Sequence, residues 1–252
     1  MKLYIFNKTK FLKKVSPGIL IVLLLTFTFV SNSFGQEMVR LEDKRISISM
    51  KDVAFGTVIG HLTRNYGLSF GVEVVPGYEE SDDLRFAMSK PNYEIFIEKK
   101  TQFSLDLKDA SLAEVMDSLM KQKPGYRWEI SDGVINIFPT EARDERLRKL
   151  LELKIASFVM ENERDLLVGK ILDCIVDLPE LKVFEKSYDL SIPRTHVGSI
   201  DALFIKMDKV QFKNLSLKQL LNKLALVKGG SWRLTLTASG DPSIKDRIWL
   251  EI

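Results

Sequence analysis

The side chains best suited to catalysis or metal binding are few and widely separated in this sequence. Its 252 residues include two histidines, His61 and His196, and one cysteine, Cys174. A structural zinc site needs about four such ligands at short spacing, and a nucleophilic cysteine needs a base within hydrogen-bond reach. Cys174 lies in an apolar helical context instead, which favours a buried, inert thiol. We therefore predict no catalytic residue, no metal ligand and no cofactor.

Acidic residues cluster in the polar stretch 77–83, where Glu79 and Glu80 are followed by Asp82 and Asp83. Such a cluster attracts cations, but solvated charge is the expected role of acids in a polar loop. Paired carboxylates for glycoside cleavage stay open, because any two of the 34 acids could meet in the fold. A hydrolase is therefore kept as the third alternative for function.

Four aromatic residues form a candidate interaction surface. Tyr126 and Trp128 alternate on one face of an expected strand, and Trp232 and Trp249 lie in a second expected strand pair. Packing in the core is the expected role of these rings, whereas an exposed aromatic patch would bind a protein or a glycan. The second alternative is therefore an envelope protein that binds a glycan or a small ligand.

The first 35 residues have the composition of a secretory signal peptide. Five lysines and no acid lie between Lys2 and Lys14, and the 12 residues 19–30 are apolar or threonine. Small residues then precede a cleavage site between Gly35 and Gln36, which completes the pattern that signal peptidase requires. A membrane-spanning helix needs about 20 apolar residues. We therefore expect cleavage, a periplasmic or secreted location and no stable membrane insertion.

Removing residues 1–35 changes the charge balance of the chain. The full sequence has 37 basic and 34 acidic residues, and the five lysines of the expected signal leave 32 basic against 34 acidic. A net charge of −2 lacks the basic excess of a nucleic-acid-binding surface, so no nucleic-acid partner is expected. A single cysteine also excludes an intramolecular disulfide.

The most informative feature is a repeated strand–helix unit. Residues 46–62 align without gaps with 103–119, and 210–224 follow the same pattern. Each unit begins with alternating apolar residues, a polar break follows, and apolar residues then recur at helical spacing. These residues predict three helix stripes: Phe55, Val58, Ile59 and Leu62; Leu112, Val115, Met116 and Leu119; Leu217, Leu220, Leu221 and Leu224.

The starts of these helices differ in their capping residues. Ser111 with Glu114, and Ser216 with Gln219, have the spacing of a capping box. Ala54 stands at the equivalent position of the first unit, so we expect a more weakly defined first helix.

Hairpins and further strands surround these helices. Residues 125–138 with an Asp-Gly turn predict one hairpin, and 231–252 predict another with a longer loop. Single strands are expected within 67–72 and around 93–97. A fourth, degenerate unit is expected over 153–185, with a strand, a helix capped by Asn162, and a strand at Leu181–Phe184.

The expected organisation is therefore two tandem double βαβ modules after the signal peptide at 1–35. They cover residues 44–139 and 151–252, and the charged run 140–150 joins them as a solvated linker helix. We predict an α+β fold in which repeated βαβ units form small mixed sheets with helices packed on one face.

The segment 103–119 and the hairpin that follows it resemble the secretin and TonB short N-terminal (STN) domain. Residues 46–70 look like the first half of that domain, and 151–252 resemble it loosely. The resemblance implies a small periplasmic fold that binds other envelope proteins in secretion, TonB-dependent uptake or signalling. It does not extend to the channel and receptor functions of longer family members. The expectation is an exported, non-catalytic interaction module.

Overall fold

The computed structural model describes residues 41–74, 102–140, 143–160, 163–194, 204–207, 209–237 and 243–252. These residues belong to one compact unit, Leu41–Ile252. The expected signal peptide with its Gly35–Gln36 cleavage site, the acidic stretch 77–83 and the expected strand around 93–97 lie outside the described residues.

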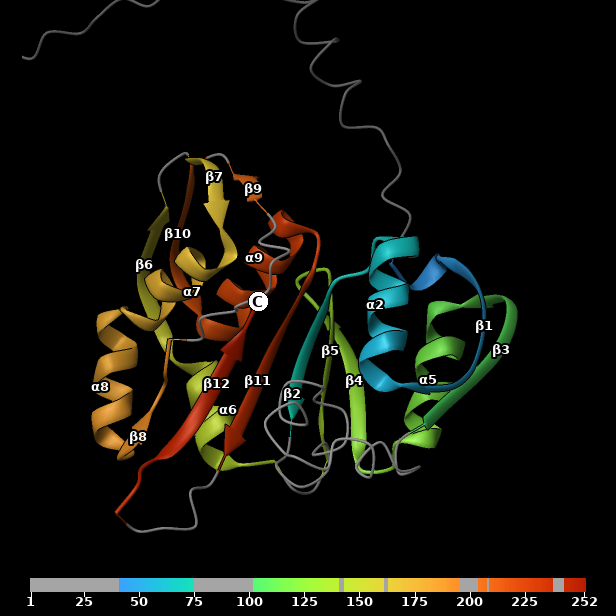
Figure 1. The fold of residues 1–252 in the computed structure, drawn as a ribbon, viewed down its shortest axis with the longest axis horizontal. Helices are drawn as coiled ribbons and strands as arrows, with labels where there is room; N and C mark the ends of the chain where they lie inside the picture. Colours follow the sequence, from blue (N-terminus) through green and yellow to red (C-terminus); the bar gives the residue numbers. More distant parts are fainter. Residues whose placement is uncertain are drawn as a thin grey trace, which may run out of the picture. The chain divides into compact units, whose positions relative to one another are not determined.

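The first module follows the predicted order of strands and helices (Figure 1). A short 3₁₀ turn, η2, precedes it at Leu41–Asp43. Its elements are β1 (Arg45–Ala54), α2 (Phe55–Tyr66), β2 (Phe70–Val74), β3 (Gln102–Ser111), α5 (Leu112–Gln122), β4 (Tyr126–Ser131) and β5 (Val134–Pro139).

Among the residues that the structure describes, the second module contains more elements than the first. They are α6 (Glu145–Glu152), β6 (Lys154–Met160), β7 (Glu163–Leu167), α7 (Val168–Val176), α8 (Pro179–Ser187), β8 (Leu190–Ser191), β9 (Phe204–Met207), β10 (Val210–Ser216), α9 (Leu217–Lys228), β11 (Ser231–Thr237) and β12 (Asp246–Glu251).

The three predicted helix stripes are confirmed. All twelve residues are buried, four each on α2, α5 and α9. Helix α9 buries two more side chains, Asn222 and Ala225, which widen its buried face. The stripes of α2 and α5 pack in one hydrophobic core and that of α9 packs in a second.

The polar break in each unit is a backbone turn of one kind. Asp52, Asp109 and Asn214 have φ values of 51°, 52° and 53°, and each lies two residues before a helix N-cap. Asp and Asn adopt this left-handed conformation more readily than other non-glycine residues. The pairing of β1 with β3 is irregular between Met50 and Val53, beside Asp52. The repeated Lys-Asp or Lys-Asn pair therefore marks a backbone turn at which the chain changes direction between the strand and the helix.

The predicted capping boxes are also confirmed. The Ser111 and Ser216 side chains each accept a hydrogen bond from the backbone N–H three residues on, and the Glu114 and Gln219 side chains complete the boxes. Ala54 makes no side-chain cap, as expected, although α2 is as long as α9.

The expected strand at Leu181–Phe184 is wrong, because these residues lie in α8. Leu181 and Phe184 are buried three residues apart, while Val183 between them is 66% exposed. That spacing is helical, and Pro179 in the first turn is the position that a helix tolerates for proline. The strand that closes the unit is the short β8 instead.

The helix start expected at Asn162 is also wrong. Residues 163–167 form strand β7, paired antiparallel with β9, and the helix begins only at Val168. Asn162 itself lies outside the described residues.

The charged run 140–150 contains the expected helix but is not simply solvated. Leu147, Leu150 and Leu151 of α6 are buried in the second core. Arg146 anchors the same helix to the end of the sheet by an ion pair of 2.8 Å with Asp246. The helix is therefore an integral element of the second module.

A six-stranded mixed sheet contains strands from both modules, in the order β4-β5-β2-β11-β12-β8 (Figure 1). Two antiparallel ribbons, β1–β3 and β6–β10, occupy equivalent places in the two modules. The fold is α+β, as predicted.

The two hydrophobic cores lie on opposite faces of this sheet. β2 runs parallel to β11, and the first-core residues Phe70 and Val72 pair with Ser231 and Arg233. The second-core residue Trp232 pairs with Gly71 instead. Because side chains alternate between faces along a strand, the second core faces away from the first.

The modules are related by a half-turn about an axis that lies in the plane of the sheet and runs across the strands. In each one, a hairpin (β4–β5, β11–β12) is followed by a strand parallel to its second member (β2, β8). The parallel pairing of β2 with β11 reverses the strand direction from one module to the next. A half-turn of this kind also exchanges the faces of the sheet, in agreement with the placement of the cores.

Candidate functional site

The histidine and the cysteine of the described residues lie in structural positions. His61 is half-buried on α2, where its ring contacts Tyr66 and the Asn65 amide lies 2.9 Å from Nδ1. Cys174 is half-buried and packs against the second core. His196 lies outside the described residues. Within the ranges that the structure describes, no three His, Cys, Asp or Glu side chains meet as a metal site would require.

Two of the four candidate aromatic residues lie in the hydrophobic cores, which is the role expected for these rings. Tyr126 and Trp232 are 6% and 1% exposed, because each packs in the core of its own module. Trp128 and Trp249 are half-buried. The four rings therefore do not form one exposed aromatic platform.

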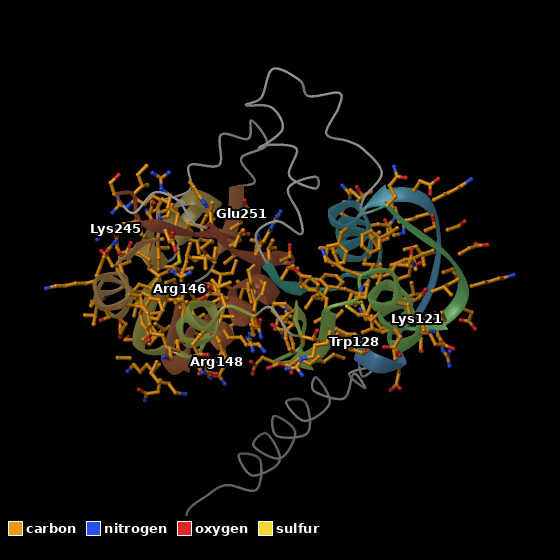
Figure 2. All side chains as sticks on the ribbon, turned by 90° about the horizontal axis from the view of Figure 1, so that it is seen from below. Lys121, Trp128, Arg146, Arg148, Lys245 and Glu251 are labelled. Carbon is orange, nitrogen blue, oxygen red and sulfur yellow. The ribbon has the colours of Figure 1, made fainter. Side chains whose placement is uncertain are left out.

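Trp128 lies on β4, the edge strand of the six-stranded sheet, and is labelled in Figure 2. Its indole Nε1 donates a hydrogen bond of 2.9 Å to Asp117 on α5. The ring therefore covers the rim of the first core and leaves part of its surface at the sheet edge.

The module junction is the region around the β2–β11 pair: Gly71, Glu73, Ser131, Arg143, Asn222 and Trp232. At its centre the indole of Trp232 covers Gly71. A Cβ atom at Gly71 would lie 2.4 Å from two carbons of the indole. Glycine is therefore required here for close approach between the strands.

Asn222 joins the two modules by hydrogen bonds. It is fully buried on α9, and its Oδ1 accepts a hydrogen bond of 2.8 Å from the indole Nε1 of Trp232. Its Nδ2 donates to the backbone carbonyl of Ser131, in the first module, at 3.2 Å. One amide thus satisfies a buried donor in one module and an acceptor in the other.

Glu73 of β2 is the most deeply buried carboxylate of the junction, with 3% of its side chain exposed. Arg143 donates two hydrogen bonds to its two oxygens, at 2.7 and 2.8 Å. Burial raises the pKa of Glu73, and the Arg143 guanidinium opposes that rise. The pair ties β2 to the segment that enters the second module.

A second ion pair crosses the junction near the sheet edge. Lys218 of α9 lies 2.6 Å from Glu129 of β4, and its ammonium lies 5.7 Å from the centre of the Phe138 ring. Arg127 of β4 lies over the same ring at 4.6 Å. Helix α9 therefore covers part of the first module as well as its own.

Sequence reasoning missed Asn222, Gly71 and Glu73 as junction residues. Asn222 follows Leu221 in the predicted helix and is the polar member of the buried face of α9. Glu73 lies at the end of an otherwise apolar strand. A polar residue among apolar residues that are expected to be buried is the sequence signal for such junction residues, since buried polar groups require hydrogen-bond partners.

None of the helices in the described part of the chain is long and apolar enough to span a membrane. Comparison of the sequence with protein-family models finds no match, and neither does a search of curated proteins. The resemblance to the STN domain therefore rests on the pattern of apolar residues in the repeated units.

Proposed function

We propose that this chain is an exported, non-catalytic interaction module of the STN type that docks an envelope protein. The signal-like residues 1–35 support export to the periplasm or beyond. The protein would act there by adding strands at its sheet edges, a recognised mode of protein binding.

The observation that carries this proposal is the pairing of β2 with β11. One module presents the first strand of its hairpin as an open edge, and the other module adds a parallel strand to it over five residue pairs. Modules of this type thus bind one another through the sheet edge. An envelope protein with a similar strand can use the same mode at the edge that remains.

The polar groups of the junction support a structural rather than a chemical role. Asn222, Glu73 and Arg143 are all engaged in bonds that join the modules. The burial of Trp232 removes the central ring of the glycan-binding alternative.

Site-specific photo-crosslinking in cells tests the proposal. A photoreactive residue at Arg127, on the exposed side of β4, should crosslink to a defined envelope protein. The matched control carries the same residue at Lys186, which is exposed on α8 and distant from β4 in sequence. Equal crosslinking at both positions, or none at either position, would contradict the proposal, as would fractionation of the protein with the cytoplasm.

A further inference from the structure

We infer that the outer edge of β4 is the docking edge and that its occupant is a parallel strand of a partner protein, with apolar residues alternating with at least one acid. This inference rests on the proposed function and specifies the strand, its direction and its chemistry. Four observations on the described residues lead to it.

First, β4 is the counterpart of β11. Both open the hairpin of their module, and both pair antiparallel with the second hairpin strand. The other side of β11 holds β2 in parallel. The other side of β4 has no neighbour among the described strands, because β4 ends the six-stranded sheet. The half-turn that relates the modules therefore places a parallel strand at this edge.

Second, the backbone of β4 offers hydrogen-bonding groups at this edge. Ser131 and Val134 close a two-residue turn in which Asp132 and Gly133 both have positive φ. In such a hairpin the closing pair is hydrogen bonded and the pattern alternates along the strand. Trp128 and Ile130 therefore direct their N–H and C=O groups away from β5, toward the open side.

Third, the side chains of β4 specify the chemistry of the strand. Trp128 and Ile130 are half-buried and face the first core, so an incoming strand with apolar residues on that face would bury them further. Arg127 is exposed on the opposite face and has no carboxylate partner among the described residues. Lys218 and Arg143 do have such partners. An acid on that face of the strand would complement Arg127.

Fourth, the opposite edge of the sheet is protected. β8 is two residues long, and the N–H that follows it, at Ile192, donates a hydrogen bond of 2.6 Å to the Glu185 carboxylate. Pro193 comes next and has no N–H to donate. A short strand, a side-chain cap and a proline are devices that keep a sheet edge from pairing. Lys245, beside the β8 end, and Trp128 lie toward opposite sides of the unit in Figure 2.

The chain supplies its own probe for the test. A synthetic peptide of residues 67–74, which contains β2, has the apolar alternation and the acid of Glu73. We expect this peptide to shift the backbone amide NMR signals of Arg127–Ser131 in the whole protein, in a saturable manner. A spin label at its C-terminus should broaden Ser131 more than Arg127 if the strand is parallel. An unlabelled peptide of the same composition in scrambled order is the control.

Two variants make the assignment specific. Ile130→Pro removes an outward N–H without breaking a bond to β5 and should abolish peptide binding, while Ile130→Ala loses the same packing and should retain it. Arg127→Glu should weaken binding about two- to fivefold, the value of an exposed ion pair, and a peptide with lysine in place of its glutamate should restore it. Arg127→Glu keeps the test decisive if Ile130→Pro unfolds the protein.

Four results would overturn the inference: no shifts at millimolar peptide, shifts at β8, broadening that indicates an antiparallel strand, or no response to charge reversal. Photo-crosslinks from Arg127 into residues 84–100 of the same chain would assign the edge to that segment instead. If an envelope partner binds the protein independently of β4, the proposed function stands and only the assignment of β4 as the docking edge is wrong.

Discussion

The indole Nε1 of Trp232 donates a hydrogen bond of 2.8 Å to Oδ1 of Asn222, in the interior of the second module. The same amide donates to the carbonyl of Ser131 in the first module. A single side chain on α9 therefore determines how the aromatic core of one module meets the hairpin of the other.

Replacing Asn222 by leucine should destabilise the protein by about 2 to 4 kcal/mol. The change leaves the buried indole N–H without a partner, which costs about 1 to 3 kcal/mol, and removes one hydrogen bond to the Ser131 carbonyl, which costs about 1 kcal/mol. Urea unfolding followed by tryptophan fluorescence measures the loss. The double variant Asn222→Leu/Trp232→Phe removes the indole donor too, so its cost should be smaller than the sum of the single costs. Strict additivity would show that the bond has no energetic role.

Gly71→Ala should destabilise the protein by about 1 to 3 kcal/mol, the usual range for overpacking in a dense interior. The new Cβ would overlap the indole of Trp232. In a Trp232→Phe background, in which one smaller ring replaces the two fused rings of the indole, the same change should cost clearly less. Gly56→Ala on α2 is the control, because no atom lies within 4 Å of a Cβ there. Equal costs of Gly71→Ala in the two backgrounds would contradict the close approach.

Arg143→Met should destabilise the protein by about 3 to 5 kcal/mol at neutral pH, because it leaves the Glu73 carboxylate buried without its partner. Burial already raises the pKa of Glu73, and loss of Arg143 raises it further. The native state then keeps a proton that the unfolded chain releases, so stability falls as pH rises above 4.5 through the native pKa. Denaturant unfolding between pH 4 and 8 should show this fall. The Arg143→Met/Glu73→Gln variant should lack it; a fall of the same size there would exclude Glu73 as its cause.

Lys228→Met should stabilise the protein at neutral pH and change its alkaline profile. Burial lowers the pKa of Lys228 from 10.5 to about 8. Between these values the unfolded chain binds a proton that the native state has lost, so wild-type stability should rise from pH 8 to 10.5. A shift of this size corresponds to at most about 3 kcal/mol. Lys186→Met, at an exposed position, is the control. A rise that persists unchanged in Lys228→Met would contradict the assignment.

Ala54→Ser should stabilise the protein by about 0.5 to 1 kcal/mol, since it supplies the N-cap hydroxyl that α2 lacks. Ser111→Ala and Ser216→Ala should each cost about 1 kcal/mol for the converse reason. Thermal and urea unfolding of the three variants tests the set. A loss in both serine variants with no gain from Ala54→Ser would show that the β1–α2 turn does not present a serine hydroxyl to the helix.

The local part of this fold could be predicted from the sequence. Periodicity alone identified the buried stripes of three helices, and a Ser and a Glu or Gln three residues apart identified two caps. The Asp-Gly pair identified the turn between β4 and β5. Each of these features depends on residues within one or two turns of one another.

The missed features depend on contacts between distant residues or on ambiguous short patterns. Leu181–Phe184 contains too few apolar residues to separate a two-residue from a 3.6-residue period, and only the burial of Leu181 and Phe184 with Val183 exposed decides for a helix. The sheet shared by the modules depends on Gly71 meeting Trp232, a pairing that no local pattern encodes. For the same reason the sequence left open which of the four aromatic rings are exposed, since a strand pattern does not say what covers its face.

The pairing of Phe70 with Ser231 has a consequence for the order in which the protein is completed. β2 belongs to the early part of the chain, while its neighbour β11 comes almost at the C-terminal end. Contacts between such distant residues form slowly, because a long loop must close first. A chain that is synthesised or threaded from its N-terminus can pair β2 with β5 early, but it leaves the other edge of this apolar strand open until nearly all of the chain has emerged. A chain interrupted before residue 231 would keep that edge exposed, and open edges of apolar strands aggregate.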